Sequence, residues 1–96
     1  MPCYVLTRAA ENDIASIARY TVETFGVEQA IAYRDHLVRA FEFLAQYPRA
    51  ARERPELRQP SRVYPCQSHV IVYRIAGDGI VIQRVRHGRE DWINDG

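Results

Sequence analysis

The C-terminal third of the sequence carries residues that bind anions and one residue that can move protons. They are Arg74, Arg84, Arg86, His87 and Arg89. Arginine binds phosphate and carboxylate groups through parallel hydrogen bonds, but it is too basic to exchange protons at neutral pH. All thirteen basic residues are Arg, so there is no lysine amine for acid–base work. His87, assisted by Asp91, is the only candidate general acid or base in this group, which favours anion binding over bond cleavage.

The same residues also have structural interpretations, and both kinds stay open at this point. His87 could close a strand through a hydrogen bond to the backbone or to Asp91, and Arg84 and Arg86 could pair with acidic residues of helices. Trp92 could pack on a sheet or stack on a nucleic-acid base. The choice between these interpretations depends on the elements that carry the residues.

Charge is divided unevenly between the two halves of the chain. Residues 9–47 carry three Arg and six Asp or Glu, whereas residues 48–89 carry nine Arg and three acidic residues. The whole chain has a formal net charge of only +1. A basic half predicts a surface for something anionic: nucleic acid, an acidic protein segment, or the acidic half of the chain itself.

Two helices are predicted in the acidic half. Apolar residues recur at helical spacing over about 9–25, with Thr7 placed to cap the first turn and Gly26 placed to end the helix in a left-handed conformation. A second amphipathic pattern runs over about 28–46 and ends before Pro48. Because only one or two residues separate the helices, they must form an antiparallel hairpin.

The basic half is predicted to form a sheet after a connector. Residues 48–62 are rich in Arg and Pro, which breaks any long helix. Three apolar runs follow, at 63–66, 69–76 and 80–87, and a Gly-Asp-Gly turn joins the last two as a hairpin. With a first strand at 3–7 and a short tail at 88–96, residues 1–96 form one domain of order β-α-α-β-β-β. This order predicts an α+β fold, with the helical hairpin packed on a small, mostly antiparallel sheet.

Two strand patterns decide where the basic residues are expected. Both faces of 69–76 are apolar, which is typical of a central strand. In 80–87, simple alternation places Ile80, Ile82, Arg84 and Arg86 on one face. We therefore expect this face to change from apolar to basic along the strand.

Membrane, secretory and metal-binding classes find no support in the sequence. No apolar run approaches the roughly 18 residues of a membrane span, and the first residues lack the basic and apolar regions of a secretion signal. A cytoplasmic location is therefore expected. Cys3 and Cys66 lack metal-site spacing, and thiols in a reducing compartment are typically small core side chains. No cofactor or metal is expected.

The second predicted helix has an apolar arc that is too wide for a single neighbour. Tyr33, Leu37, Phe41 and Leu44 belong to this arc, and Arg34 lies within it. Such a helix contacts two elements, or it leaves part of its arc for a partner. Periodicity does not distinguish core positions from groove positions, so these residues are candidates for either role.

Several short patterns, taken together across the whole chain, match a known family. They are Tyr4-x-Leu6-Thr7-x-x-Ala10-x-x-Asp13, Leu44-Ala45-x-x-Pro48, Val72-Tyr73-Arg74 and His87-x-Arg89-x-Asp91. In this order and spacing they resemble the ParE branch of the RelE/ParE superfamily, the toxin halves of bacterial toxin–antitoxin modules.

The resemblance implies a non-enzymatic protein that poisons DNA gyrase and that a ParD-type antitoxin neutralises. It also implies a hetero-oligomer of toxin and antitoxin, in which operator DNA is contacted only through the antitoxin. The residues expected to meet the target are Arg84, Arg86, His87, Arg89, Asp91 and Trp92. The residues expected to meet the antitoxin are Tyr33, Arg34, Leu37, Phe41, Leu44, Arg52 and Arg58.

The RelE branch of the same superfamily provides the alternative, a ribosome-dependent endoribonuclease that cleaves mRNA. In that case His87 would act together with Arg84 and Arg86. RelE-like enzymes often carry a Tyr or His near the C-terminus, but the last Tyr here is Tyr73, so no Tyr follows the final strand. The sequence therefore favours the ParE branch.

Overall fold

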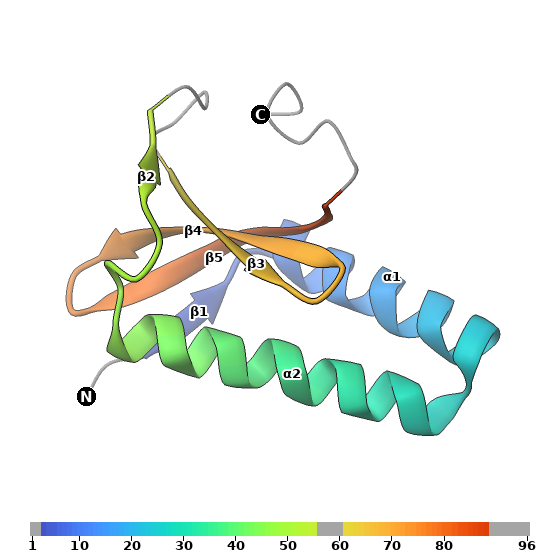
Figure 1. Ribbon diagram of the computed structural model, residues 1–96. Helices are drawn as coiled ribbons and strands as arrows, with labels where there is room; N and C mark the ends of the chain where they lie inside the picture. The colour runs from blue at the N-terminus through green and yellow to red at the C-terminus, as the bar shows by residue number, and fades with distance from the viewer. Residues whose placement is uncertain (1–2, 56–60, 89–96) are drawn as a thin grey trace.

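The computed structural model describes residues 3–55 and 61–88. Its elements, in chain order, are β1 (Tyr4–Leu6), α1 (Arg8–Phe25), α2 (Val27–Gln46), β2 (Glu53–Arg54), β3 (Ser61–Cys66), β4 (His69–Ala76) and β5 (Gly79–His87). The strands form one sheet in the order β1-β5-β4-β3-β2, with β1 parallel to β5 and the other neighbours antiparallel. Both helices lie on one face of the sheet (Figure 1). The predicted α+β fold is confirmed, with one addition: the two-residue β2 extends the sheet within the predicted connector.

Thr7 joins the start of α1 to the sheet. Its side-chain oxygen accepts a hydrogen bond from the N–H of Ala10 (3.0 Å), as predicted for the N-cap, and its hydroxyl donates to the carbonyl oxygen of Gln83 (2.8 Å). Its own N–H donates to the carbonyl oxygen of Ile82 (3.1 Å). One residue thus caps α1 and continues the hydrogen bonding of β1 to β5, which determines where α1 lies against the last strand.

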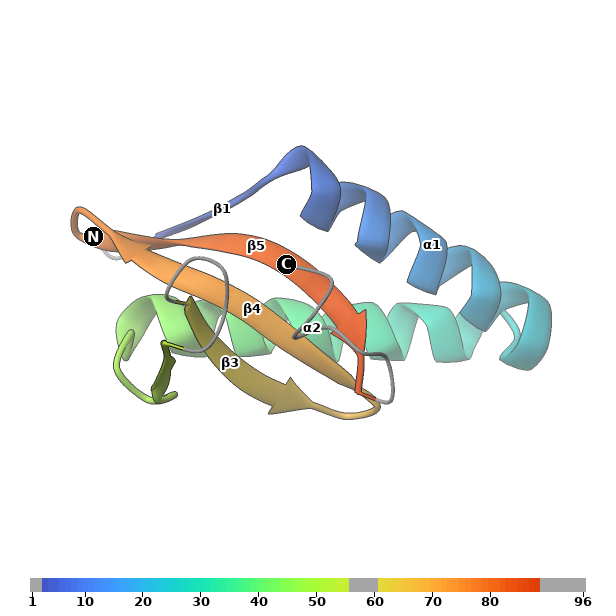
Figure 2. The ribbon, with the colours of Figure 1, turned by 90° about the horizontal axis from the view of Figure 1, so that it is seen from above.

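Gly26 alone separates α1 from α2. Its φ of 96° is positive, as predicted, but its ψ of 168° is extended, so the left-handed helical conformation that we expected is not adopted. The N–H of Gly26 donates to the carbonyl oxygens of Thr21 and Val22, which ends α1. The tip of the resulting helical hairpin lies beyond the end of the sheet (Figure 2).

The hydrophobic core lies between α2 and the central strands of the sheet. Leu37, Phe41 and Leu44 of α2 are at most 2% exposed, and they belong to the same buried cluster as Ile71 and Tyr73 of β4. The wide apolar arc of α2 is thus largely core. The predicted antitoxin contacts Leu37, Phe41 and Leu44 are thus core residues of the isolated chain.

A β-bulge separates the arginines of β5 from its apolar face. The ladder between β4 and β5 contains one extra residue, Gln83, between the paired residues Ile82 and Arg84. Ile82 and Val85 are buried, whereas Arg84 and Arg86 are only partly covered. The expectation that both arginines continue the apolar face is wrong, because an extra residue reverses the alternation of side chains along a strand.

Tyr73 of β4 anchors the chain that follows α2. Its ring is fully buried. Its hydroxyl donates to the carbonyl oxygen of Pro48 (2.7 Å) and accepts a hydrogen bond from the N–H of Ala51 (3.4 Å). The guanidinium of Arg62 on β3 donates to the carbonyl oxygen of Ala51 (2.7 Å). The segment between α2 and β2 is therefore held against the sheet by buried polar contacts.

The two cysteines do not behave alike. Cys66 is partly buried, and burial raises the pKa of its thiol. Cys3 is exposed, so the expectation of a core role is wrong for this residue. Within the described ranges, no group of three or more His, Cys, Asp or Glu residues is placed to hold a metal ion. Neither helix has the length and apolar character that crossing a membrane requires.

Candidate functional site

Asp13 of α1 binds the part of β5 that extends beyond the last residue pair between β1 and β5. The last pair between β1 and β5 is Leu6 with Ile82. Beyond it, Oδ2 of Asp13 accepts hydrogen bonds from the N–H of Val85 (2.9 Å) and from Nε of Arg84 (2.8 Å), and Oδ1 accepts from Nη2 of Arg84 (3.0 Å). A bidentate pair of this kind fixes the guanidinium plane. Arg84 is thereby held at the edge of β5, with its side chain 40% exposed.

A pocket of about 170 Å³ lies beside this ion pair, between α1 and the end of β5. The polar and charged residues that line it are Asp13, Ser16, His69, Arg84, Arg86 and His87. Three of the predicted target residues, Arg84, Arg86 and His87, are thus brought together at one place. The other three, Arg89, Asp91 and Trp92, lie outside the described residues.

His69 and His87 lie side by side at the open end of the β4–β5 ladder. The two residues are paired in the sheet, and their ring centroids are 5.3 Å apart. The prediction that His87 is the only candidate general acid or base is wrong, because His69 places a second imidazole next to it. Two adjacent imidazoles can bind an anion through charged N–H groups, or they can donate and accept protons in turn.

The ring of Tyr33, on α2, contacts the ring of His69. Its hydroxyl is hydrogen-bonded to Nδ1 of His69 and accepts a hydrogen bond from the N–H of Ser68 (3.3 Å). Burial raises the pKa of the Tyr33 phenol, so its hydroxyl keeps its proton at neutral pH. Tyr33 therefore positions an imidazole, whereas the sequence suggested it as an antitoxin contact.

A second surface consists of three aromatic rings where α2 meets β3. The ring centroid of Phe43 lies 5.4 Å from that of Tyr47 and 5.8 Å from that of Tyr64. Phe43 and Tyr47 are 42% and 54% exposed. We call these residues the aromatic strip. The sequence analysis did not single them out, and the i, i+4 spacing of Phe43 and Tyr47 was the available signal.

The other predicted antitoxin residues are scattered over the molecule. Arg34 is exposed on α2, and Arg52 is exposed in the segment between α2 and β2. Arg58 lies outside the described residues. The candidates therefore divide into core residues, a residue that supports His69, and exposed arginines. Of the described candidates, Tyr33, Arg34 and Leu37 line one small pocket between α1 and α2, whereas Arg52 lies in the segment after α2.

The tip of the helical hairpin carries a third exposed group of apolar side chains. They are Tyr20, Phe25, Val27 and Ile31, each more than half exposed. The rings of Tyr20 and Phe25 make an edge-to-face contact with centroids 6.4 Å apart. We call these four residues the hairpin-tip patch. The connection between α1 and α2 lies beyond the end of the sheet (Figures 1 and 2).

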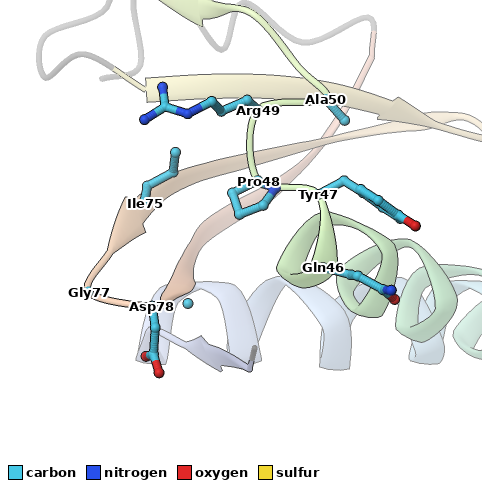
Figure 3. Close-up of a pocket in the computed structure, with 9 residues that line it drawn as sticks. Gln46, Tyr47, Pro48, Arg49, Ala50, Ile75, Gly77 and Asp78 are labelled. Atoms are coloured by element: carbon cyan, nitrogen blue, oxygen red, sulfur yellow. The ribbon is translucent and has the colours of Figure 1, made fainter. Parts of the chain in front are cut away.

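A larger and more open pocket, of about 580 Å³, lies between the end of α2 and the turn that joins β4 to β5 (Figure 3). Its two charged residues, Arg49 and Asp78, lie on opposite sides of it (Figure 3). Pro48 and Ile75 are among the residues between them. This arrangement brings no acid, base or nucleophile together, so we do not assign chemistry to this pocket.

The fold and the basic end of the sheet define a small α+β protein, and sequence comparison shows which family it belongs to. The family model described as ParE toxin of type II toxin-antitoxin system, parDE, matches residues 4–92. The chain therefore belongs to the ParE toxin family of type II toxin–antitoxin systems.

Individual relatives match along almost their whole length. The chain is 36% identical over 87 residues to Toxin ParE1 of Caulobacter vibrioides, covering 91% of this chain and 90% of that protein. It is 35% identical over 89 residues to Toxin ParE1 of Mycobacterium tuberculosis, covering 92% and 91%. The solved structure titled Chromosomal ParDE TA system from P. aeruginosa has a similar fold, with a TM-score of 0.77 at 24% identity over 91% of this chain and 96% of that chain.

Proposed function

We propose that this ParE toxin inhibits DNA gyrase and thereby blocks replication. The observation that carries the proposal is the similarity to ParE toxins at 31–36% identity over about nine-tenths of the chain. A supercoiling and DNA-cleavage assay with purified gyrase tests it. The residues proposed to contact gyrase or its DNA are Arg84, Arg86 and His87, continued by Arg89, Asp91 and Trp92.

We further propose that the protein acts by binding, without catalysing a reaction. Asp13 holds the guanidinium of Arg84 in a fixed position, which suits recognition of an anionic group. Tyr73, the last Tyr of the chain, is fully buried with its hydroxyl on the carbonyl oxygen of Pro48, so it is not available for proton transfer. Both features support a binding role for this end of the sheet.

For the antitoxin, we propose a ParD-type protein that forms a hetero-oligomer with this toxin and docks on the aromatic strip. The strip offers exposed rings next to α2, and Arg52 lies exposed in the segment that follows this helix. A segment with apolar and acidic side chains matches both features. In this arrangement operator DNA is contacted only through the antitoxin. Because gyrase and operator DNA are cytoplasmic, the toxin acts in the cytoplasm.

The alternative function, ribosome-dependent cleavage of mRNA, is favoured by one observation. His69 and His87 have ring centroids 5.3 Å apart, so one could act as base and the other as acid in transferring the 2′-hydroxyl proton and releasing the 5′-oxygen. An mRNA cleavage assay on purified ribosomes separates the two functions. Cleavage that is lost in His87→Ala, together with unchanged gyrase activity, would replace the gyrase proposal.

A further inference from the structure

We propose that the pocket between α1 and the end of β5 binds a phosphodiester group of DNA, with His69 and Ser16 as members of the site. This inference rests on the proposed function, because gyrase-bound DNA would supply the phosphate. It adds two residues that neither the sequence patterns nor the resemblance indicated.

The charge balance around the pocket supports an anionic ligand. Both carboxylate oxygens of Asp13 are already used by Arg84, and one of them also by the N–H of Val85. Among the described residues, Asp13 is the only acid that lines the pocket, and Arg84 balances its charge. Arg86 adds a second guanidinium to the same lining, beside the two imidazoles.

The donors around the pocket suit a phosphate group. Arg86 contributes a guanidinium, Ser16 a hydroxyl, and His69 and His87 contribute ring N–H groups, all from residues that line one pocket. A phosphodiester has two anionic oxygens that accept several hydrogen bonds, and DNA-binding proteins meet it with this mixture of side chains. The volume of about 170 Å³ is several times the ~30 Å³ that one water molecule takes up in the liquid, so a phosphate group can enter the pocket.

The test is the affinity of the full chain for a short duplex of DNA, measured by fluorescence anisotropy. Imidazole NMR signals are followed in the same titration and in a second one with inorganic phosphate alone. We expect Arg86→Gln and His69→Gln each to weaken DNA binding about tenfold, since a charge-assisted hydrogen bond is lost. Arg74→Gln, which removes an exposed Arg from the same sheet, should change affinity less than about twofold.

Three results would overturn the inference. The first is equal weakening by Arg74→Gln and Arg86→Gln, which means general attraction by the basic half without a site. The second is imidazole signals that do not move when the unmodified protein is titrated, a measurement that does not depend on the folding of any variant. The third is tighter binding or cleavage of single-stranded RNA of the same sequence, which assigns the pocket to RNA.

The phosphate-binding test and the gyrase test can fail independently of each other. Gyrase inhibition with no phosphate in the pocket removes this inference and leaves the function intact. Phosphate and DNA in the pocket with gyrase unaffected removes the function and leaves the site.

Discussion

The carboxylate of Asp13 accepts hydrogen bonds from both the side chain of Arg84 and the N–H of Val85, the residue that follows it. The paired part of β1 ends before this point. The side chain of Asp13 therefore accepts the hydrogen bond that a neighbouring strand would otherwise accept from β5. The same contact orients the arginine beside the candidate phosphate pocket. Fold stability and the geometry of the site therefore depend on one residue.

Replacement of Asp13 should cost more stability than replacement of its partner Arg84. Asp13→Ala leaves the N–H of Val85 and a partly buried guanidinium without their acceptor, so we expect a loss of about 2–3 kcal/mol in the free energy of unfolding. Arg84→Ala leaves the bond between Asp13 and Val85 in place, and the Arg84 side chain is 40% exposed, so we expect a loss of about 1 kcal/mol. Urea denaturation measures both. Equal losses would contradict the role given to Val85.

Gly79 is required where β1 approaches the turn between β4 and β5. A Cβ at this position would lie 2.4 Å from the carbonyl oxygen of Cys3, which itself accepts a hydrogen bond from the N–H of Ile80. Gly79→Ala should therefore displace β1 and lower stability by about 2 kcal/mol. Gly88→Ala is the matched control, because its nearest contact would be an ordinary 3.4 Å. Thermal unfolding that shows equal shifts for the two variants would refute the close approach.

Tyr73→Phe tests the anchor of the segment after α2. Its hydroxyl is hydrogen-bonded to Pro48 and Ala51, so its removal should lower the free energy of unfolding by about 1–2 kcal/mol. The amide hydrogen of Ala51 should also exchange faster. Burial raises the pKa of Tyr73 above its ordinary value, which means that the folded state retains the proton more tightly than the unfolded state. Its contribution is present below about pH 10 and is lost as the pH rises through the folded-state pKa. The variant should therefore lose stability less steeply at alkaline pH, and an unchanged slope would contradict this assignment.

The antitoxin proposal is tested by two matched Phe→Glu substitutions. Phe43 belongs to the aromatic strip and Phe25 to the hairpin-tip patch, and both are exposed. Phe43→Glu should weaken binding of the cognate antitoxin at least about tenfold, because it places a charge in an apolar interface. Phe25→Glu should change affinity less than about twofold. Calorimetric titration gives both values, and the reverse order would move the antitoxin to the hairpin tip.

The fold was largely predictable because its signals are local. Thr7, Gly26, the proline after α2 and the Gly-Asp-Gly turn each mark an element boundary through their own backbone chemistry. The site was less predictable because it depends on Gln83, a single extra residue in a ladder. If β5 had no bulge, the register set at the turn between β4 and β5 would pair His69 with Arg86. With the bulge, His69 pairs with His87. Nothing in the alternation of β5 identifies that residue.

The core of α2 shows a second limit of sequence patterns. Leu37 and Phe43 are both apolar residues of α2, yet Leu37 is buried and Phe43 is 42% exposed. The two side chains point about 120° apart around the helix, and helical periodicity does not say which of these directions the sheet covers. Long-range placement therefore separated the core from the aromatic strip.

The most direct test of the central claim is a DNA gyrase assay with the purified protein, scored for supercoiling and for cleaved DNA. The account predicts lost supercoiling and accumulated cleaved complexes. Arg86→Glu should weaken the effect about tenfold or more and Arg74→Glu less than about twofold, since Arg86 lines the pocket and Arg74 does not. Unchanged supercoiling and no cleaved DNA, with the protein folded and toxic in cells, would contradict the account.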